Sequence, residues 1–200
     1  MLYSKNVSDK TYLVFGLGNS GSEYLANRHN VGFMVLDVLA KRLGSATFKT
    51  HKSGAIVAEG RLGMGGPKVI LAKTTGYMNT SGKPVSALLK FYGLNNSNLI
   101  VIHDELDIPS MDVRIKTAGG HAGHNGLRDI IAATGSNEFT RVRFGIGRPP
   151  GQMATADFVL RDFGTAEKKE LPVTLELAAD AVETVITDGV LVAQQKFHGN

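Results

Sequence analysis

The segment over residues 11–17 constrains the fold of this chain more than any other. It is a run of apolar, β-branched and aromatic residues that ends among glycines, which is typical of a buried β-strand. A polar stretch containing Asn19 and His29 follows, and a helical apolar pattern begins at Val31. In α/β proteins, ligands bind beyond the carboxyl ends of the strands. We therefore expect an α/β sheet with a functional site at this strand end.

Strand-like and helix-like patterns alternate along the rest of the chain. Further strands are predicted over 55–62, 68–73, 99–103, 113–116 and 141–146, and helices over 31–43, 81–92, 125–133, 165–188 and 190–197. The glycine-rich turn at 63–67 predicts a hairpin, and hence a mixed sheet. Pro172 should break or kink the helix that contains it. We expect a loop over 148–155.

The expected architecture is a single α/β domain in which helices flank a mixed, twisted sheet. A chain of 200 residues has room for one domain, at most two. We expect a mobile N-terminal tail over residues 1–10 and one domain over 11–200, with C-terminal helices over about 165–198. The chain has no cysteine, which excludes disulfides and thiolate nucleophiles. It also shows neither a signal-peptide run nor a membrane-spanning segment, so we expect a cytoplasmic protein.

One histidine and one carboxylate suggest hydrolytic chemistry. His29 follows the first strand, and Asp104 follows the strand over 99–103. A carboxylate bonded to one ring nitrogen fixes the tautomer and makes the other nitrogen a better base. Glu105 and Asp107 compete for this role, although strand alternation turns Glu105 to the opposite side from Asp104. No serine lies in a nucleophile elbow, so the sequence favours direct attack by an activated water.

Three asparagines lie at predicted junctions between strands and helices: Asn19, Asn79 and Asn125. Each offers two hydrogen-bond donors and an acceptor without adding charge. Such groups can hold a water, bind peptide-like amides and stabilise an oxyanion. Asparagine beside glycine also caps turns, and this structural role is the alternative for each of them.

Two ligand classes are disfavoured. His121 and His124 suggest a metal site, but they lie in a glycine-rich loop and lack a third ligand at the usual spacing, so we expect no metal and no cofactor. Residues 16–21 match a dinucleotide fingerprint, yet polar residues precede the helix and the next strand enters a hairpin. A nucleotide-dependent oxidoreductase is therefore the weaker alternative.

Basic residues flank the glycine-rich loop on two predicted strands. Arg114 and Lys116 share one face of their strand, as do Arg141 and Arg143. Two such pairs can bind a phosphate. The net charge of +4 permits a polyanionic partner without requiring one.

Five ordered motifs resemble those of bacterial peptidyl-tRNA hydrolases. They are Gly16-Leu-Gly-Asn19-x-Gly-x-x-Tyr24, Arg28-His29-Asn30-x-Gly32-Phe33, Tyr77-Met-Asn79-x-Ser-Gly82, His103-Asp-Glu-Leu-Asp107 and Gly119-Gly-x-x-Gly-His124-Asn-Gly-Leu-Arg128. The segment Arg141-Val-Arg143-Phe-Gly-Ile-Gly-Arg-Pro149 is also similar to that family. The resemblance covers the chain from about residue 11 to the C-terminal helices. It implies a monomeric α/β protein, without metal, that cleaves the ester between a peptide and the 3′ ribose of tRNA.

The resemblance also implies roles for the polar residues named above. His29 would be the general base, and Asp104 would orient it. Asn19 would help to reject aminoacyl-tRNA with a free amine. Asn79 and Asn125 would bind the peptide backbone and the 3′ end, and would help to position water.

Four further residues would contact the tRNA. The resemblance implies that Tyr24 and Tyr77 line the site of the tRNA end. Lys116 and Arg143 would clamp the 5′ phosphate of the acceptor stem. A different class of protein, a non-catalytic RNA-binding module on the same scaffold, would bind tRNA without releasing peptide.

The chain departs from the family pattern in several loops. Ser20, Asn27, Thr74 and Gly76 replace the usual residues beside the motifs, and Ser110-Met111 replaces a glycine-containing turn. None of these positions removes a proposed catalytic group. The departures bear on the rigidity of the loops and not on the class of reaction.

Overall fold

A seven-stranded mixed sheet forms the centre of the structure, a computed structural model that describes residues 10–198. The strand order is β2-β3-β4-β1-β5-β7-β6. The strands are β1 (Thr11–Gly16), β2 (Lys49–His51), β3 (Ala55–Arg61), β4 (Lys68–Thr74), β5 (Leu99–Glu105), β6 (Val113–Thr117) and β7 (Thr140–Gly145). β4, β1, β5 and β7 run parallel, so their carboxyl ends meet at one edge. The other three strands pair antiparallel, which confirms the predicted mixed sheet and hairpin.

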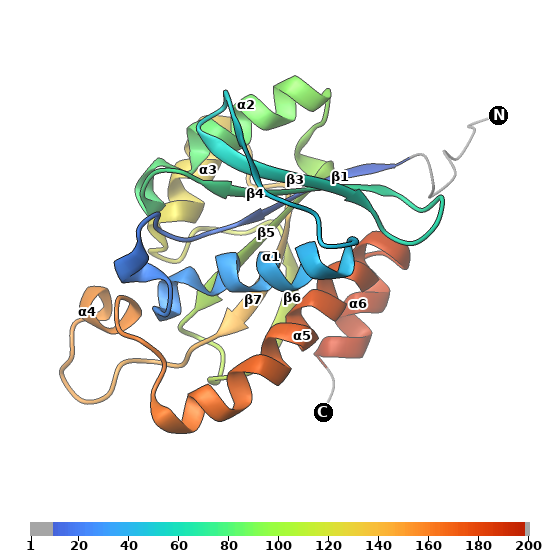
Figure 1. Cartoon of the computed structure of the whole chain (residues 1–200). Coiled ribbons are helices and arrows are strands. Elements are labelled where there is room, and N and C mark those ends of the chain that lie inside the picture. Colours follow the sequence, from blue (N-terminus) through green and yellow to red (C-terminus); the bar gives the residue numbers. More distant parts are fainter. Residues whose placement is uncertain (1–9, 199–200) are drawn as a thin grey trace.

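Helices cover both faces of this sheet. They are α1 (Val31–Arg42), α2 (Gly82–Tyr92), α3 (Asn125–Thr134), α4 (Thr155–Val159), α5 (Thr165–Thr187) and α6 (Val190–Phe197). Figure 1 shows α1 and α5 on one face and α2 and α3 on the other. Alternation along β1 separates two cores: Val14 packs in the cluster that includes α1 and α5, whereas Leu13 and Phe15 pack in the cluster that includes α2 and α3. The predicted α/β fold is confirmed.

Several short elements that carry polar residues were not predicted. Single-turn 3₁₀ helices follow β1 and β4: η2 (Ser22–Tyr24), η3 (Arg28–Asn30) and η4 (Met78–Thr80). A fourth, η5 (Asn96–Asn98), precedes β5. The strand β2 and the helix α4, which begins where we expected a loop to end, were missed as well. Elements of three to five residues are too short to show a hydrophobic period, so the pattern of the sequence does not reveal them.

Pro172 does not divide the C-terminal helix. α5 runs without interruption from Thr165 to Thr187 with this proline inside it, so the expected break is wrong. A proline removes one backbone hydrogen bond, at a cost of about 3 kcal/mol in a helix interior. Pro172 and Lys168 are both exposed, so water can satisfy the freed carbonyl of Lys168. The apolar face of α5, packed against the sheet, continues past this point.

The predicted N-terminal tail and C-terminal helices concern the two ends of the chain. The tail that we expect over residues 1–10 lies outside the described residues apart from Lys10. α5 and α6 occupy the region where we expect the C-terminal helices. Within residues 10–198, none of the helices has both the length and the apolar character that a membrane span needs.

Candidate active site

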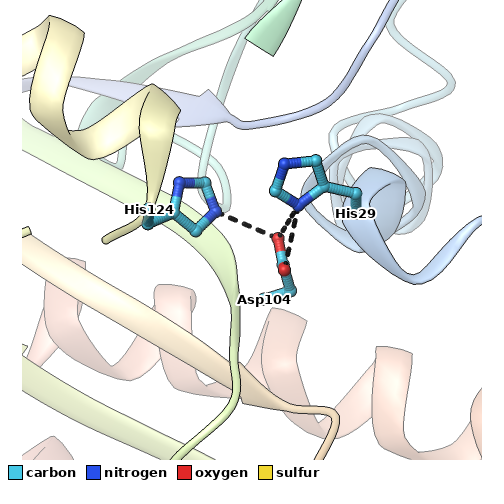
Figure 2. Close-up of side chains that lie close together, drawn as sticks. All are labelled: His29, Asp104 and His124. Carbon is cyan, nitrogen blue, oxygen red and sulfur yellow. Dashed lines mark hydrogen bonds and ion pairs between the residues drawn. The ribbon is translucent and has the colours of Figure 1, made fainter. Parts of the chain in front are cut away.

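His29 and Asp104 lie together at the carboxyl ends of β1 and β5. η3 carries His29, and Asp104 is the penultimate residue of β5. The His29 Nδ1 atom is 2.9 Å from Oδ1 and 3.0 Å from Oδ2 of Asp104 (Figure 2). β1 and β5 are adjacent and parallel, so the residues that follow them meet. The structure brings the two residues together as expected from the sequence.

His124 joins this pair as a third member. Its Nε2 atom is 3.0 Å from Asp104 Oδ1, on the opposite side of the carboxylate from His29 (Figure 2). Its Nδ1 atom accepts the backbone N–H groups of Gly126 and Leu127 at 3.2 and 3.4 Å, because His124 is the N-cap of α3. An accepting Nδ1 places the proton on Nε2, which then donates to Asp104. From the sequence, His124 was expected only as a possible metal ligand. Its position directly before a predicted helix was the signal for a cap.

The carboxylate sets the protonation of both His29 and itself. Burial disfavours the charged form of His29, but the charge of Asp104 and its hydrogen bond outweigh this and raise the pKa of His29 above 6.5. Burial alone would raise the pKa of Asp104, yet the two imidazoles hold it well below its usual value. Asp104 is therefore an anion that accepts from Nδ1–H of His29. The lone pair of His29 Nε2 is left available for a proton.

These three side chains also place possible metal ligands within 4.8 Å of one another. A ligating His124 would need its lone pair on Nε2 and its proton on Nδ1. That nitrogen, however, faces the backbone N–H groups of Gly126 and Leu127. Metal-ligating histidines usually donate their second N–H to an acceptor, which is the opposite arrangement. The donor set fits a hydrogen-bond network better than a metal site.

A buried imidazole lies beside this network. His103 is 1% exposed, and its Nδ1 is 2.7 Å from the backbone carbonyl of Asp104. Burial, together with the neighbouring His124, lowers the pKa of His103 to about 3. His103 therefore stays neutral and adds no charge to the site.

A cavity of about 430 Å³ opens next to His29 and Asp104. Three segments supply most of its lining: residues 103–107 at the end of β5, residues 121–125 before α3, and the helix α4. His29 and Arg148 complete the lining. α4 supplies Thr155, Ala156 and Val159. The cavity thus has a polar floor, formed by the histidines and Asp104, and a less polar wall.

Asn19 is buried and held on several sides. Its Oδ1 accepts the backbone N–H of Met78 at 2.7 Å. Its backbone N–H and C=O each pair with the Asn30 side chain at 2.9 Å. The Asn19 amide group is therefore oriented, with its carbonyl engaged and its NH₂ left as a donor. Sequence reasoning missed Asn30, although it stands in the same motif as His29.

The other two asparagines lie apart from each other. Asn125 lines the cavity beside His29 as the first residue of α3, and its Oδ1 accepts from Arg128 at 2.9 Å. Asn79 is exposed on η4 and lines a second hollow of about 730 Å³, together with Lys83. The structure therefore does not bring Asn79 into the same cavity as Asn125.

The two tyrosines lie on neighbouring surface segments. Tyr24 is half-buried at the end of η2, and Tyr77 is 61% exposed directly before η4. Neither is among the residues that line the cavity beside His29. Tyr24 follows β1 and Tyr77 follows β4, two adjacent parallel strands of the sheet.

The basic residues of β6 and β7 share one face of the sheet. The antiparallel register pairs Arg114 with Arg143 and Lys116 with Arg141. Lys116 is exposed, and Arg143 is half-buried with Glu105 at 3.8 Å. Arg141 is buried, and its guanidinium donates to backbone carbonyls of the glycine-rich loop. Lys116 and Arg143 thus remain candidates for phosphate binding, while Arg141 holds the loop that leads to His124.

Comparison with known proteins decides the family. A family model described as "Peptidyl-tRNA hydrolase" matches residues 13–200. The chain belongs to the peptidyl-tRNA hydrolase family. A peptidyl-tRNA hydrolase of Arthrobacter sp. (strain FB24) is 60% identical over 188 residues, which cover 94% of this chain and 96% of that protein. One of Leifsonia xyli subsp. xyli is 58% identical over 187 residues, covering 94% and 96%.

Solved structures of the peptidyl-tRNA hydrolase family share the fold. The crystal structure of peptidyl-tRNA hydrolase from Acinetobacter baumannii superposes with a TM-score of 0.86 at 35% identity. The match covers 97% of this chain and 96% of that chain.

The departures from the peptidyl-tRNA hydrolase pattern lie outside the hydrogen bonds of His29 and Asp104. Met111 has φ of +65°, a conformation that costs a non-glycine residue about 1–2 kcal/mol. Its side chain packs against the core, which offsets part of that cost. Ser110 donates to Glu167 at 2.9 Å, and the buried Asn27 forms a bridge to Asp162. These residues lie in the surrounding loops and form none of the hydrogen bonds between Asp104 and the two histidines.

Proposed function

We propose that this chain hydrolyses the ester between the peptide and the 3′ ribose of peptidyl-tRNA, with His29 as the general base and Asp104 as the group that orients it. Membership of the peptidyl-tRNA hydrolase family supports the reaction. The observation that carries the assignment of residues is the contact between His29 Nδ1 and Asp104. It commits one ring nitrogen to the carboxylate and leaves Nε2 for water beside a cavity.

The reaction follows from this geometry. His29 Nε2 takes a proton from water, and the oxygen attacks the ester carbonyl carbon to form a tetrahedral oxyanion. The intermediate collapses by breaking the bond to the ribose 3′ oxygen, which receives the proton from the imidazolium. Asp104 stabilises the imidazolium between these steps. The products are tRNA with a 3′ hydroxyl and a free peptide acid, which ionises to the carboxylate and releases its proton to solvent.

Neutral asparagine side chains can stabilise the negative charge that develops on the ester carbonyl oxygen. Asn125 lines the cavity beside His29, so its NH₂ group can donate to the oxyanion or to the peptide backbone. One such donor is worth about 3–4 kcal/mol. Asn19 is not among the lining residues, and we propose that its NH₂ group acts on the substrate near the amine. Because the carbonyl of Asn19 is already engaged by Met78, its orientation is fixed before substrate binds. We assign Asn19 to the discrimination against a free amine, and Asn79 and Asn125 to the peptide backbone and the 3′ end.

The substrate selectivity tests this proposal. Protein treated with a chelator, which is then removed, should release tRNA from N-acetyl-aminoacyl-tRNA and leave free-amine aminoacyl-tRNA intact. The measurement is the fraction of charged tRNA over time. Equal cleavage of both substrates would contradict the role of Asn19. Activity that disappears and returns with added zinc would contradict a metal-free mechanism. Binding of both tRNAs without release would favour a non-catalytic RNA-binding module.

Four further residues would contact the tRNA part of the substrate. Tyr24 and Tyr77, on the segments that follow β1 and β4, would contact the tRNA end. Lys116 and Arg143 would bind the 5′ phosphate of the acceptor stem. We propose that the protein acts as a monomer, because each group in this mechanism comes from one chain, and that it works in the cytoplasm, where translation uses tRNA.

Removing the charges of Lys116 and Arg143 should weaken tRNA binding and should make that binding less dependent on salt. In Lys116→Gln/Arg143→Gln, the slope of log affinity against log salt concentration should become shallower by about 1 per residue, because fewer counterions are released. Fluorescence titration with tRNA at several salt concentrations measures the slope. Lys49→Gln/Lys90→Gln removes the same charge at exposed residues elsewhere and is the control. Equal slopes for the two double variants would place the RNA on another surface.

A further inference from the structure

Arg28, which directly precedes His29, is a buried cation with several fixed partners. Its side chain is 9% exposed. Nη1 donates to the backbone carbonyls of Asp162 at 2.7 Å and Arg161 at 3.2 Å, and Nη2 donates to Glu167 Oε2 at 2.5 Å. The partners lie more than 130 residues away in sequence. A planar guanidinium can make this set of bonds, whereas a lysine ammonium cannot reproduce its fork.

Two aromatic rings complete the environment of this guanidinium. Its central carbon lies 4.5 Å from the ring centre of Phe158 and 5.4 Å from that of Phe163. Phe158 belongs to α4, and Phe163 lies between α4 and α5. Arg28 therefore holds both the end of α4 and the segment that follows it.

Glu167 extends the connection into two further segments. Its carboxylate accepts the backbone N–H of Gly164 at 2.7 Å and the Ser110 hydroxyl at 2.9 Å. These bonds place the start of α5 and the turn before β6 in the same network. Burial opposes ionisation of Glu167, but its backbone and side-chain partners outweigh this and lower its pKa.

The segment held by Arg28 is a wall of the cavity beside His29. α4 contributes Thr155, Ala156 and Val159 to that wall, and it contacts η3, which carries His29. In Figure 1, α4 projects from the body of the molecule next to the segment before α1. A helix of five residues is too short to hold its own position, so its place depends on tertiary contacts.

We propose that Arg28 is a positioning residue that sets the α4 wall against His29 and thereby determines how tightly the peptide part of the substrate is held. This inference rests on the proposed function for its kinetic consequence, but not for the structural coupling itself. His29 is hydrogen-bonded to Asp104, a residue of β5, and the Arg28 guanidinium takes no part in these bonds. Loss of Arg28 should therefore affect binding more than the chemical step.

Arg42 supplies a matched control. It also joins an early helix to α5, through Glu176, Asp180 and Glu183. None of these residues lines the cavity beside His29. Arg42→Gln thus removes an arginine network of similar size from the same scaffold without touching the α4 wall.

Hydrogen–deuterium exchange and steady-state kinetics on the full chain test the inference together. In Arg28→Gln, amides of residues 155–161 should exchange at least about tenfold faster, and KM for peptidyl-tRNA should rise about tenfold while kcat changes less than about threefold. Arg28→Lys should retain part of the protection, because it keeps the charge beside Glu167. Arg42→Gln should leave both the α4 exchange and KM as in the parent protein.

Several results would overturn the inference. Unchanged exchange over 155–161 in Arg28→Gln would show that Arg28 does not hold α4. A fall in kcat with an altered pH profile would place its effect on His29 instead of the wall. If Arg28→Gln does not fold, Glu167→Gln tests the same connection by removing only the charge, and unchanged α4 exchange there would count against it. Failure of the proposed function is distinguishable, because the exchange measurement needs no substrate.

Discussion

Replacing His29 with alanine should lower kcat/KM for peptidyl-tRNA by about 10²–10⁴-fold, the usual contribution of a general base. The substitution removes Nε2, the nitrogen left free by the Asp104 contact, so water must attack without losing a proton to the protein. The residues that we propose as oxyanion donors and tRNA contacts are unchanged in this variant. The rate of tRNA release under single-turnover conditions measures the loss directly, because it separates chemistry from binding.

The same variant should keep its fold and its affinity for tRNA. The residues that we propose to bind phosphate, Lys116 and Arg143, lie on β6 and β7, away from η3. His51→Ala is the matched control: His51 packs against Phe91 and Tyr92, and it does not line the cavity beside His29. Activity of His29→Ala within a few-fold of the parent protein would exclude His29 as the base. Loss of tRNA binding together with activity would mean that the substitution had disturbed the fold.

The layers of the fold could be predicted because their signals are local. Buried strands such as 99–103 are continuous apolar runs, and the glycine-rich turn at 63–67 requires a hairpin. The break at Pro172 was wrong for a reason that the sequence does not show. Whether a helix continues through a proline depends on what its flanking turns pack against. Residues of α5 on both sides of Pro172, such as Leu171 and Val182, pack in the core that α5 shares with α1 and the sheet.

The contact of His29 with Asp104 could be anticipated from topology alone. His29 follows β1 and Asp104 lies near the end of β5, and the carboxyl ends of these two neighbouring parallel strands lie side by side. The role of His124 could not be anticipated in this way. It depends on the loop before α3, in which the non-glycine residue Ala122 has φ of +48°, and on an N-cap that fixes which ring nitrogen carries the proton.

Sequence reasoning also grouped residues that the structure separates. Arg141 and Arg143 share a strand face, as expected. The guanidinium of Arg141, however, donates hydrogen bonds to the backbone carbonyls of Gly119 and Gly120. Asn79 and Asn125 both lie at predicted junctions between a strand and a helix, yet in the structure they line different cavities. Strand alternation gives the face of a side chain, but the loops that pack over that face decide what the side chain can reach.

Replacing Asp104 with asparagine should cost about 10³–10⁴ in kcat/KM, by analogy with the loss when the aspartate of a serine-protease triad is changed in this way. An asparagine can present its NH₂ group to His29 and favour the tautomer with the proton on Nε2, which cannot act as a base. It also removes the charge that stabilises the imidazolium. Both effects act on the chemical step, so the loss should appear in kcat as well as in kcat/KM.

The pH profile gives this variant a second signature. The unprotonated form of His29 is the active one, so activity rises with pH through its pKa. In the parent protein Asp104 raises that pKa above 6.5, against the opposing effect of burial. Without the negative charge of Asp104, burial is left to lower the pKa of His29. The acid limb of the kcat/KM profile should therefore move to lower pH. The residual activity of Asp104→Asn should therefore persist in acid, where that of the parent protein falls. An acid limb that stays in place would mean that the group titrating in the profile is not the imidazole paired with Asp104.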